Sequence, residues 1–381
     1  MSTASPPLSL YVHIPWCVRK CPYCDFNSHE SNNVDEAGYL SALSRDLQED
    51  LQYVQDRTVQ SIFIGGGTPS LFSAEAIGNL LEDISARLTL ADDIEITMEA
   101  NPGTFEQERF RGFREAGVNR LSIGIQSFAD AQLKAIGRIH GGDESHRAID
   151  IAHQAGFDNI NIDLMYALPE QSLEMAVEDV TIACDKGVQH ISHYQLTIEP
   201  NTYFHKFPPV QPDDDRRWAI QNACQRVLAV NGYAQYEVSA YATPGRRSRH
   251  NMNYWRFGDY LGIGAGAHGK LTTADGKVTR RWKRRQPLDY MRGAMANDAA
   301  SGGEVIEQDQ LVFEFLLNAL RLKSGVALET FEACTGLDRQ SLIDHCREVD
   351  AELLSITESE IRTTAKGFNF LNEVLEGLLP E

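Results

Sequence analysis

Three cysteines lie close together near the start of the chain, Cys17, Cys21 and Cys24, in the spacing C-x3-C-x2-C. Thiolates are the usual protein ligands of iron–sulfur clusters. Three thiolates on one short loop can bind three corners of a cubane [4Fe–4S] cluster, which leaves the fourth iron without a protein ligand. The amino and carboxylate groups of S-adenosylmethionine (SAM) can chelate such an iron. Electron transfer from the cluster can then break the adjacent sulfonium bond and release a carbon radical.

Two other interpretations of this loop stay open. A structural zinc site needs a fourth ligand, which His13 or His29 would have to supply. A redox C-x2-C pair would leave Cys17 without a role. The remaining cysteines are scattered through segments with helical patterns, and we expect them to be buried single thiols; they are Cys184, Cys224, Cys334 and Cys346.

The elements that must position the cysteine loop alternate between apolar runs and helical patterns from residue 8 to about residue 200. The expected strands are 8–14, 61–64, 94–99, 120–124, 160–165 and 190–197, and the expected helices are 35–54, 73–88, 105–116, one from about 130, 144–155 and 172–186. This alternation predicts an α/β fold with a parallel sheet, a partial (βα)6 TIM-type barrel. Chemistry in such folds sits at the C-terminal strand ends, where Glu99, Gln126 and Asp163 stand.

The pattern changes after residue 205. We expect the barrel in residues 1–205, an extension that completes the sheet in 206–303, and a small helical module in 304–381. Prolines at 208, 209 and 212 mark the first junction, and a loop-rich, aromatic stretch follows at 233–269. The order of elements in the last part resembles a winged helix.

Composition limits the classes of function. The formal net charge is -19 over 381 residues, and an acidic surface repels nucleic-acid phosphates, so we expect no nucleic-acid partner. No apolar run approaches the roughly 20 residues needed to cross a bilayer. The segment 1–7 lacks the features of a secretory signal. We therefore expect a cytoplasmic protein that is not an integral membrane protein.

Several long segments, taken together, resemble a known family. The chain is similar to the radical SAM superfamily, within it to the branch of the oxygen-independent coproporphyrinogen III oxidases, and most of all to the HemW family of haem chaperones. The similarity covers nearly the whole chain. Its segments are HIPWCVRKCPYCDFNSH, IFIGGGTPS, MEANPGT, SIGIQSF, GRIHG, NIDLMYALP, YQLTIEPNT and HNMNYWRFGDYLGIGAGAHG.

The resemblance implies contacts with SAM. Tyr11 matches a residue that contacts the ligand near the cluster. Gly66, Gly67 and Thr68 belong to the turn that receives the methionyl amino group, and glycines let backbone groups approach a ligand closely. Glu99 matches a carboxylate that contacts the cofactor; the alternative for Glu99 is a capping or surface acid.

Further along the chain, Gln126, Arg138 and Asp163 match positions that surround a second SAM molecule in the oxidase branch, with Gly67 and Thr68 between the two ligand positions. An arginine can pair with a carboxylate, and an aspartate with ribose hydroxyls. The alternative is a polar network that lines the end of the sheet without a second ligand.

The chain departs from the oxidase pattern at Phe26, where the oxidases have one more cysteine. The segment HNMNYW instead resembles the HNxxYW signature of the haem chaperones, with His250, Asn251, Tyr254 and Trp255. Histidine is a good axial ligand of haem iron, and aromatic rings can stack on a porphyrin. The alternative is that these side chains only pack against the barrel opening.

Two runs of basic residues stand out in this acidic chain: Arg246, Arg247 and Arg249 in one, and Arg280, Arg281, Lys283, Arg284 and Arg285 in the other. Haem carries two propionates, and arginine pairs with carboxylates in bidentate fashion. We predict that one of the two runs contacts the propionates. The alternative is that both are solvated loops.

The resemblance implies a haem chaperone that binds haem and transfers it to apo-haemoproteins, with a [4Fe–4S] cluster and SAM as its cofactors. It also implies a homodimer and recipients such as membrane-bound respiratory enzymes. The alternative is a radical SAM enzyme of porphyrin biosynthesis that decarboxylates coproporphyrinogen III. Phe26 in place of the extra cysteine makes that activity doubtful.

Overall fold

The computed structural model describes residues 5–31, 33–103 and 106–380, so Thr104 of the MEANPGT segment and Phe105 of the expected helix lie outside the described residues. One large sheet organises the described chain. Its strands are β1 (Leu8–Ile14), β4 (Val59–Gly66), β5 (Leu90–Ala100), β6 (Arg120–Gln126), β7 (Ile160–Tyr166), β8 (His190–Gln195), β9 (Ala234–Glu237), β10 (Ala240–Ala242), β11 (Asp259–Ile263), β12 (His268–Thr272), β13 (Val278–Lys283) and β14 (Ala300–Val305).

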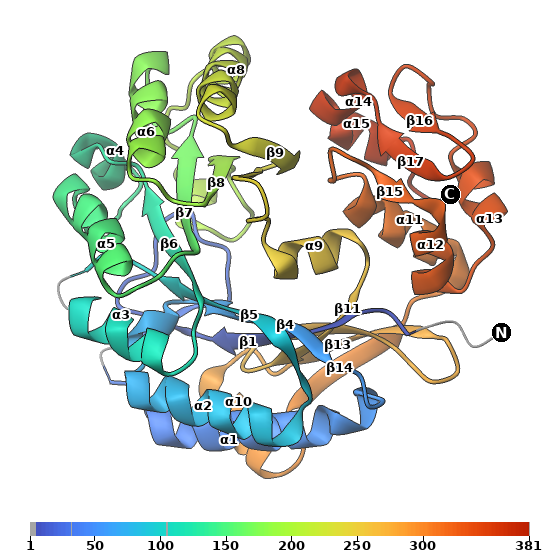
Figure 1. Cartoon of the computed structure of the whole chain (residues 1–381), viewed down its shortest axis with the longest axis horizontal. Coiled ribbons are helices and arrows are strands. Elements are labelled where there is room, and N and C mark those ends of the chain that lie inside the picture. Colours follow the sequence, from blue (N-terminus) through green and yellow to red (C-terminus); the bar gives the residue numbers. More distant parts are fainter. Residues whose placement is uncertain (1–4, 32, 104–105, 381) are drawn as a thin grey trace.

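The strand order is β14-β13-β12-β11-β1-β4-β5-β6-β7-β8-β10-β9. The strands β1 and β4 to β8 run parallel. Helices connect them and cover the outside of the curved sheet (Figure 1); they are α1 (Glu36–Asp50), α2 (Ala74–Arg87), α3 (Glu106–Glu115), α4 (Asp130–Ala135), α5 (Gly142–Gln154) and α6 (Leu173–Asp185). The prediction of a partial (βα)6 barrel is confirmed, with boundaries that shift by a few residues.

Burial explains why these segments form the sheet. Along β1, Leu8, Leu10, Val12 and Ile14 are fully or almost fully buried, and the opposite face of the strand is also covered. Parallel strands carry apolar side chains on both faces because helices pack outside and further side chains fill the inside. Helix α2 lays its apolar residues on the sheet and begins at Ser73, whose side chain accepts a hydrogen bond from the backbone N–H of Ala76.

The extension lengthens the sheet at both edges. On one side, β11 pairs parallel to β1, and β12, β13 and β14 follow as antiparallel strands. On the other side, β10 and β9 join β8 in antiparallel fashion. Residues 233–269, which were expected to be rich in loops, thus hold several strands. These strands are short, so their apolar runs in the sequence are short as well. The helices of this part are α7 (Tyr203–Lys206), α8 (Asp214–Val230), α9 (Arg249–Trp255) and α10 (Pro287–Met295).

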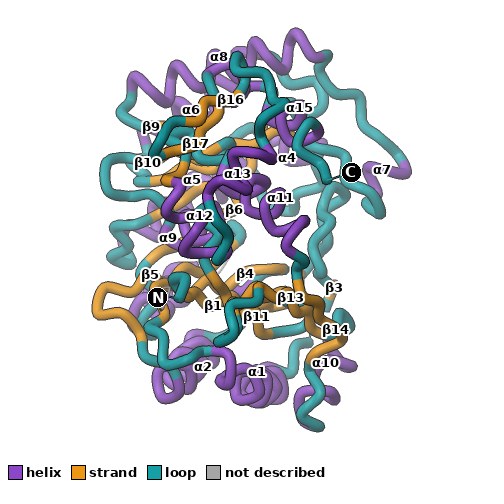
Figure 2. The backbone as a smooth tube through the Cα atoms, turned by 90° about the vertical axis from the view of Figure 1, so that its right-hand side faces the viewer, coloured by secondary structure: helices purple, strands orange, loops and turns teal. Residues whose placement is uncertain are grey.

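The last part of the chain forms a module around a second apolar core. Its three-stranded sheet has the order β15-β17-β16, from Val326–Ala327, Glu360–Thr363 and Leu354–Ile356. Its helices are α11 (Gln308–Ala319), α12 (Leu328–Thr335), α13 (Arg339–His345), α14 (Ala365–Asn369) and α15 (Leu371–Glu376). Figure 2 shows this module in front of the large sheet, with α9 beside it. The exact division at residues 205 and 303 stays a prediction.

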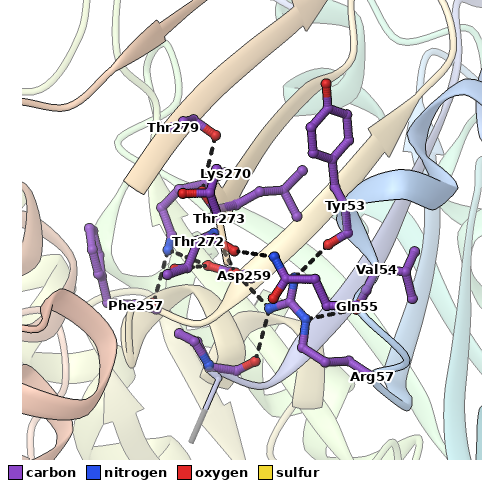
Figure 3. Close-up of polar contacts among 12 residues, drawn as sticks. Tyr53, Val54, Gln55, Arg57, Phe257, Asp259, Lys270, Thr272, Thr273 and Thr279 are labelled. Carbon is purple, nitrogen blue, oxygen red and sulfur yellow. Dashed lines mark hydrogen bonds and ion pairs between the residues drawn. The ribbon is translucent and has the colours of Figure 1, made fainter. Parts of the chain in front are cut away.

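A buried ionic cluster fixes the start of β11 (Figure 3). The carboxylate of Asp259 is fully buried, and it pairs with Arg57 at 2.7 Å and with Lys270 of β12 at 2.9 Å. The backbone N–H of Thr272 donates to the same carboxylate at 2.6 Å. Strands β11 and β12 are therefore tied to each other and to the loop before β4.

A search of the described helices finds none that is long and apolar enough to cross a bilayer.

Candidate functional site

A first cavity of about 600 Å³ opens at the C-terminal ends of the parallel strands. It brings together the cysteine loop and most of the residues expected to contact SAM. Its lining includes Cys17, Cys21, Cys24, Gly66, Gly67, Thr68, Glu99, Asn101, Gln126, Arg138, Asp163 and Tyr194. These residues come from the loop after β1 and from β4, β5, β6, β7 and β8 with their following loops. The fold thus brings together residues that lie almost 180 positions apart in the sequence.

The cysteine loop leaves β1 through β2 (Trp16–Cys17), which pairs with β3 (His29–Glu30). The glycine turn packs directly against it. A Cβ on Gly67 would lie 2.5 Å from the carbonyl oxygen of Trp16, and Gly66 has a φ of +114° with the His13 ring at the place of a Cβ. Only glycine meets both conditions, which explains the Gly-rich turn.

The three thiols are not placed for one metal ion. Within the part of the chain that the structure describes, no group of three His, Cys, Asp or Glu side chains could hold a metal ion. This argues against the zinc interpretation. A cubane makes a different demand, because each thiolate binds a different iron. Burial raises the pKa of Cys17 and of Cys24, so the thiols need the positive charge of bound iron to ionise.

Two buried carboxyl groups face the same cavity. Burial and, to a smaller extent, the neighbouring Asp163 raise the pKa of Glu99 to about 8, and burial likewise raises the pKa of Asp163. The backbone N–H of Gly66 donates to Oε2 of Glu99 at 2.9 Å, and Asn161 donates to Asp163 at 2.9 Å. A cation bound beside these carboxyls would favour their ionised forms and lower their pKa values again. The sulfonium and ammonium groups of SAM are such cations.

Arg138 ties the cysteine loop to the strand ends. Its guanidinium donates to Oδ1 of Asn101 and to the carbonyl of Gly124, each at 2.7 Å, and lies 3.6 Å from the sulfur of Cys21. Its buried Nε has no hydrogen-bond partner. An unpaired donor at this position suits a ligand carboxylate.

Gln126 also lies in this cavity, at the end of β6. Its φ of +69° is rare for a residue other than glycine, and its Oε1 accepts a hydrogen bond of 2.8 Å from Tyr194. Strain of this kind concentrates at binding sites. Asn101 and Tyr194 also line this cavity and were not predicted from the sequence. Asn101 stands within the quoted MEANPGT segment, and Tyr194 within β8 at a strand end.

A second cavity, of about 1040 Å³, lies beside the first, between α9 and the β1–β4 and β11–β13 part of the sheet. It collects the HNMNYW residues His250, Asn251, Tyr254 and Trp255. Other lining residues are Tyr11, His13, Phe63, Tyr260, His268, Lys270, Arg280, Trp282, Arg285 and Asn318. Tyr11, expected at the SAM site, lines this cavity and not the first, and its hydroxyl lies 2.7 Å from Nδ1 of His13.

His250 is buried at the wall of the second cavity. Its ring stacks on Phe63, with ring centroids 4.1 Å apart, and its Nδ1 lies 3.0 Å from Oγ of Ser248 and 3.5 Å from Glu95. Burial lowers the pKa of His250, so its ring is neutral at physiological pH. The side chain thus anchors α9 to β4 and β5.

The two basic runs differ in position. In the first run, Arg246 pairs with Asp158 at 3.5 Å, Arg249 pairs with Asp93 at 2.7 Å, and Arg247 lies over the ring of Tyr236. None of these arginines is among the residues that line the second cavity. From the second run, Arg280, Lys283 and Arg285 do line it, so only that run can meet a ligand there.

The comparisons with known proteins agree with this geometry. Residues 11–182 match the family model of the radical SAM superfamily, and residues 306–370 match that of the HemN C-terminal domain. The heme chaperone HemW of Escherichia coli K12 is 49% identical over 378 residues, 99% of each chain. Those of Haemophilus influenzae and Bacillus subtilis are 48% identical over 383 residues (99% of each chain) and 33% identical over 382 residues (98% of this chain, 99% of the relative).

The chain belongs to the HemW family. Among solved structures, the radical SAM enzyme coproporphyrinogen III oxidase HemN of Escherichia coli has a TM-score of 0.83 at 21% identity, over 99% of this chain and 91% of that chain. At that identity the likeness shows the fold alone. The predicted membership in the HemN-like branch, nearest to HemW, is confirmed.

As a HemW-family member of the radical SAM superfamily, the chain binds a [4Fe–4S] cluster and SAM. Cys17, Cys21 and Cys24 would hold the cluster, because they share one loop at the mouth of the first cavity. When bound, a cluster of this kind can supply an electron to the sulfonium group of SAM. The protein supplies the buried carboxyls and the glycine turn that line the first cavity.

The two cavities of this HemW-family chain share a wall. Gly66, Glu99 and Phe26 line both of them. Phe26 exposes 58% of its surface, which is unusual for a phenylalanine next to two cavities. Phe26, where the resemblance places the extra cysteine of the oxidases, thus lies on the wall that the two cavities share.

Proposed function

We propose that this protein is a haem chaperone that binds haem in the second cavity and transfers it to apo-haemoproteins. The observation that carries the proposal is the cavity itself, which joins the HNMNYW helix to an aromatic and basic stretch of sheet. Its volume of about 1040 Å³ is at the upper end of ordinary small-molecule sites. The relatives that match the whole chain are named heme chaperones.

The chemistry of the lining suits a flat tetrapyrrole with two carboxylates. Tyr254, Tyr260 and Trp282 offer aromatic surface, and the buried Nε1 of Trp255 has no hydrogen-bond partner. Lys270 is held by Asp259, and Arg280 pairs with Glu314. No ion pair of Arg285 is found within the described residues, so its guanidinium is the cation that can meet a propionate without breaking an existing pair.

The SAM contacts are part of the same proposal. A first SAM beside the cluster would contact Gly66, Gly67, Thr68 and Glu99. A second SAM molecule, or the remainder of the first, would contact Gln126, Arg138 and Asp163. Glu99 would contact both SAM and haem, because it lines both cavities. Tyr11 would act from the second cavity, through His13 and the glycine turn.

We further propose that the protein works in the cytoplasm, forms a homodimer when the cluster is loaded, and delivers haem to respiratory enzymes at the membrane. Phe26 and Val18 support a contact surface near the cluster, because both line the first cavity and expose 58% and 50% of their surface. Large apolar side chains exposed around one opening are typical of protein contacts.

The experiment uses the anaerobically reconstituted protein loaded with one haem. When it is mixed with an apo-haemoprotein, it should transfer its haem faster than bovine serum albumin loaded with haem does. The acceptor should then show the absorption spectrum of its haem-bound form. Absence of transfer would refute the chaperone role.

A parallel assay with coproporphyrinogen III, reductant and SAM tests the alternative. The fold is that of the oxidase, but the extra cysteine is absent at Phe26. We expect no protoporphyrinogen IX; formation of that product would make the protein an oxidase.

A further inference from the structure

Three histidines line the second cavity: His13, His250 and His268. A haem iron needs the lone pair of a neutral ring nitrogen, and that nitrogen must be free of other partners. The hydrogen bonds of the three rings therefore decide which of them can bind iron. Which histidine binds the iron is a question that rests on the proposed haem site.

His13 is committed at both ring nitrogens. Its Nε2 lies 2.8 Å from the carbonyl oxygen of Asn27, so this nitrogen carries the proton and donates. Its Nδ1 then accepts the hydrogen bond of 2.7 Å from the Tyr11 hydroxyl. The ring is also buried against Gly66. No lone pair of His13 is left for a metal.

His250 is confined in a different way. One face of its ring covers Phe63, Nδ1 lies 3.0 Å from Ser248 and Nε2 lies 3.4 Å from the same hydroxyl. The side chain is 8% exposed and rests against Glu95. Little of the ring is therefore open to a flat macrocycle in the second cavity. These contacts indicate that His250 fixes the position of α9 against the sheet.

His268 has neither restriction. It begins β12, where it pairs in register with Trp282 of β13, and the two rings lie 6.3 Å apart. Across all the residues that the structure describes, no hydrogen bond or ion pair to the His268 ring is found, and its side chain is exposed to the cavity. Burial, with smaller effects of Arg280 and Arg285, lowers the pKa of His268 and favours the neutral ring.

The neighbours of His268 suit the rest of a haem. Because side chains alternate along a strand, His268 and Lys270 share one face of β12, and Arg280 and Trp282 share the same face of β13. Trp282 offers a ring beside the histidine. Arg285, two residues beyond β13, lines the same cavity as a cation for a propionate. We propose that His268 is the axial ligand of the bound haem, with His250 holding α9 over it.

The test compares three variants of the cluster-loaded, full-length protein: His268→Ala, His250→Ala and His205→Ala. The oxidised cluster is diamagnetic, so the electron paramagnetic resonance signal of ferric haem can be read beside it. We expect His268→Ala to weaken haem binding about tenfold or more and to change this signal. Added imidazole should restore the wild-type signal, because it can occupy the space of the missing ring.

His250→Ala should weaken haem binding but keep the shape of the ferric signal. The control, His205→Ala, changes an exposed histidine that lines neither cavity, and should leave affinity and signal unchanged. An unchanged signal in His268→Ala, or a changed signal only in His250→Ala, would overturn the assignment. A wild-type protein that binds no haem would instead refute the proposed function. Since the His268 side chain is exposed, its removal does not threaten folding.

Discussion

A hydrogen bond of 2.8 Å joins the hydroxyl of Tyr236 to Nε2 of His190, and both side chains are buried. The other ring nitrogen, Nδ1, lies 2.6 Å from Oδ1 of Asn161, which also accepts from the backbone N–H of Ser192 at 3.1 Å. That N–H can only donate, so Oδ1 is an acceptor. Nδ1 of His190 therefore donates, and Nε2 accepts from Tyr236.

The row of hydrogen bonds continues toward both cavities. At one end, Asn161 donates to Asp163, which lines the first cavity. At the other end, the side chain of Asn251 lines the second cavity and lies near the hydroxyl of Tyr236, whose pKa it lowers against the larger effect of burial. From Tyr236 through His190 and Asn161, each donor in the row points toward Asp163. The row is a physical connection between the SAM side and the HNMNYW side of the molecule.

The first prediction concerns this connection. A ligand on Asp163 fixes one end of the row, which lowers the cost of ordering the other end. We expect SAM to tighten haem binding about fivefold or more in the wild type, and this factor to fall to about one in Tyr236→Phe. Haem titrations of the cluster-loaded protein, with and without SAM, measure it.

Tyr233→Phe is the matched control. Tyr233 is equally buried, but its hydroxyl donates to the carbonyl of Val188, outside the row. It should keep the wild-type factor. If Tyr236→Phe also keeps it, the row does not couple the two sites.

The second prediction concerns the pH dependence of stability without SAM. Burial raises the pKa of Glu99 from 4.5 to about 8. Between these values the folded protein keeps the proton and the unfolded chain loses it, so stability falls as pH rises through this window. Thermal unfolding of Glu99→Gln should show a shallower fall between pH 5 and 8, within roughly the window set by the two pKa values. The exposed control Glu115→Gln should follow the wild type; an equal slope in Glu99→Gln would exclude a protonated Glu99.

The third prediction concerns the propionates. Arg285→Ala should weaken haem binding about tenfold, since a charged hydrogen bond is lost. Arg246→Ala, whose partner is Asp158, should bind haem like the wild type. The dimethyl ester of haem has no carboxylates, so it should bind Arg285→Ala and the wild type equally well. A larger loss in Arg246→Ala would place the propionates at the other basic run.

The fourth prediction concerns the buried ionic cluster around Asp259, which holds Lys270 at the second cavity. Asp259→Asn leaves Arg57 and Lys270 buried without their carboxylate. The free energy of unfolding should fall by about 3 kcal/mol, as measured by chemical denaturation. Asp275→Asn removes an exposed partner of Lys277 and should leave the denaturation midpoint unchanged. An unchanged free energy of unfolding in Asp259→Asn would show that this buried ionic cluster does not stabilise the fold.

Much of the fold could be predicted because its signals are local. The apolar runs of β1 and β4, the cysteine spacing and the glycine turn each occupy one short segment of sequence. Of the residues that the resemblance assigned to SAM, Gly66, Glu99, Gln126 and Asp163 came together in the first cavity because each belongs to one of the parallel strands. Arg138 reaches the same cavity from a loop, and Tyr11 lines the second cavity instead.

The remainder depends on contacts between distant segments. Arg249 meets Asp93 across more than 150 positions, and no local pattern shows that pair. The place of Tyr11 in the second cavity follows from the pleat of β1, which points Tyr11 and His13 to the same face. His268 was overlooked because a single histidine in a glycine-rich segment carries no signal until its neighbours in space are known.

The most direct test of the haem site is a crystal structure of the haem-loaded, cluster-loaded protein, with anomalous diffraction measured at the iron absorption edge. If haem binds in the second cavity, the anomalous map will show two separate iron positions. One will lie beside Cys17, Cys21 and Cys24, and the other between α9 and β12, next to His268. Iron at the cysteine loop alone, or a haem bound outside the second cavity, would contradict the account.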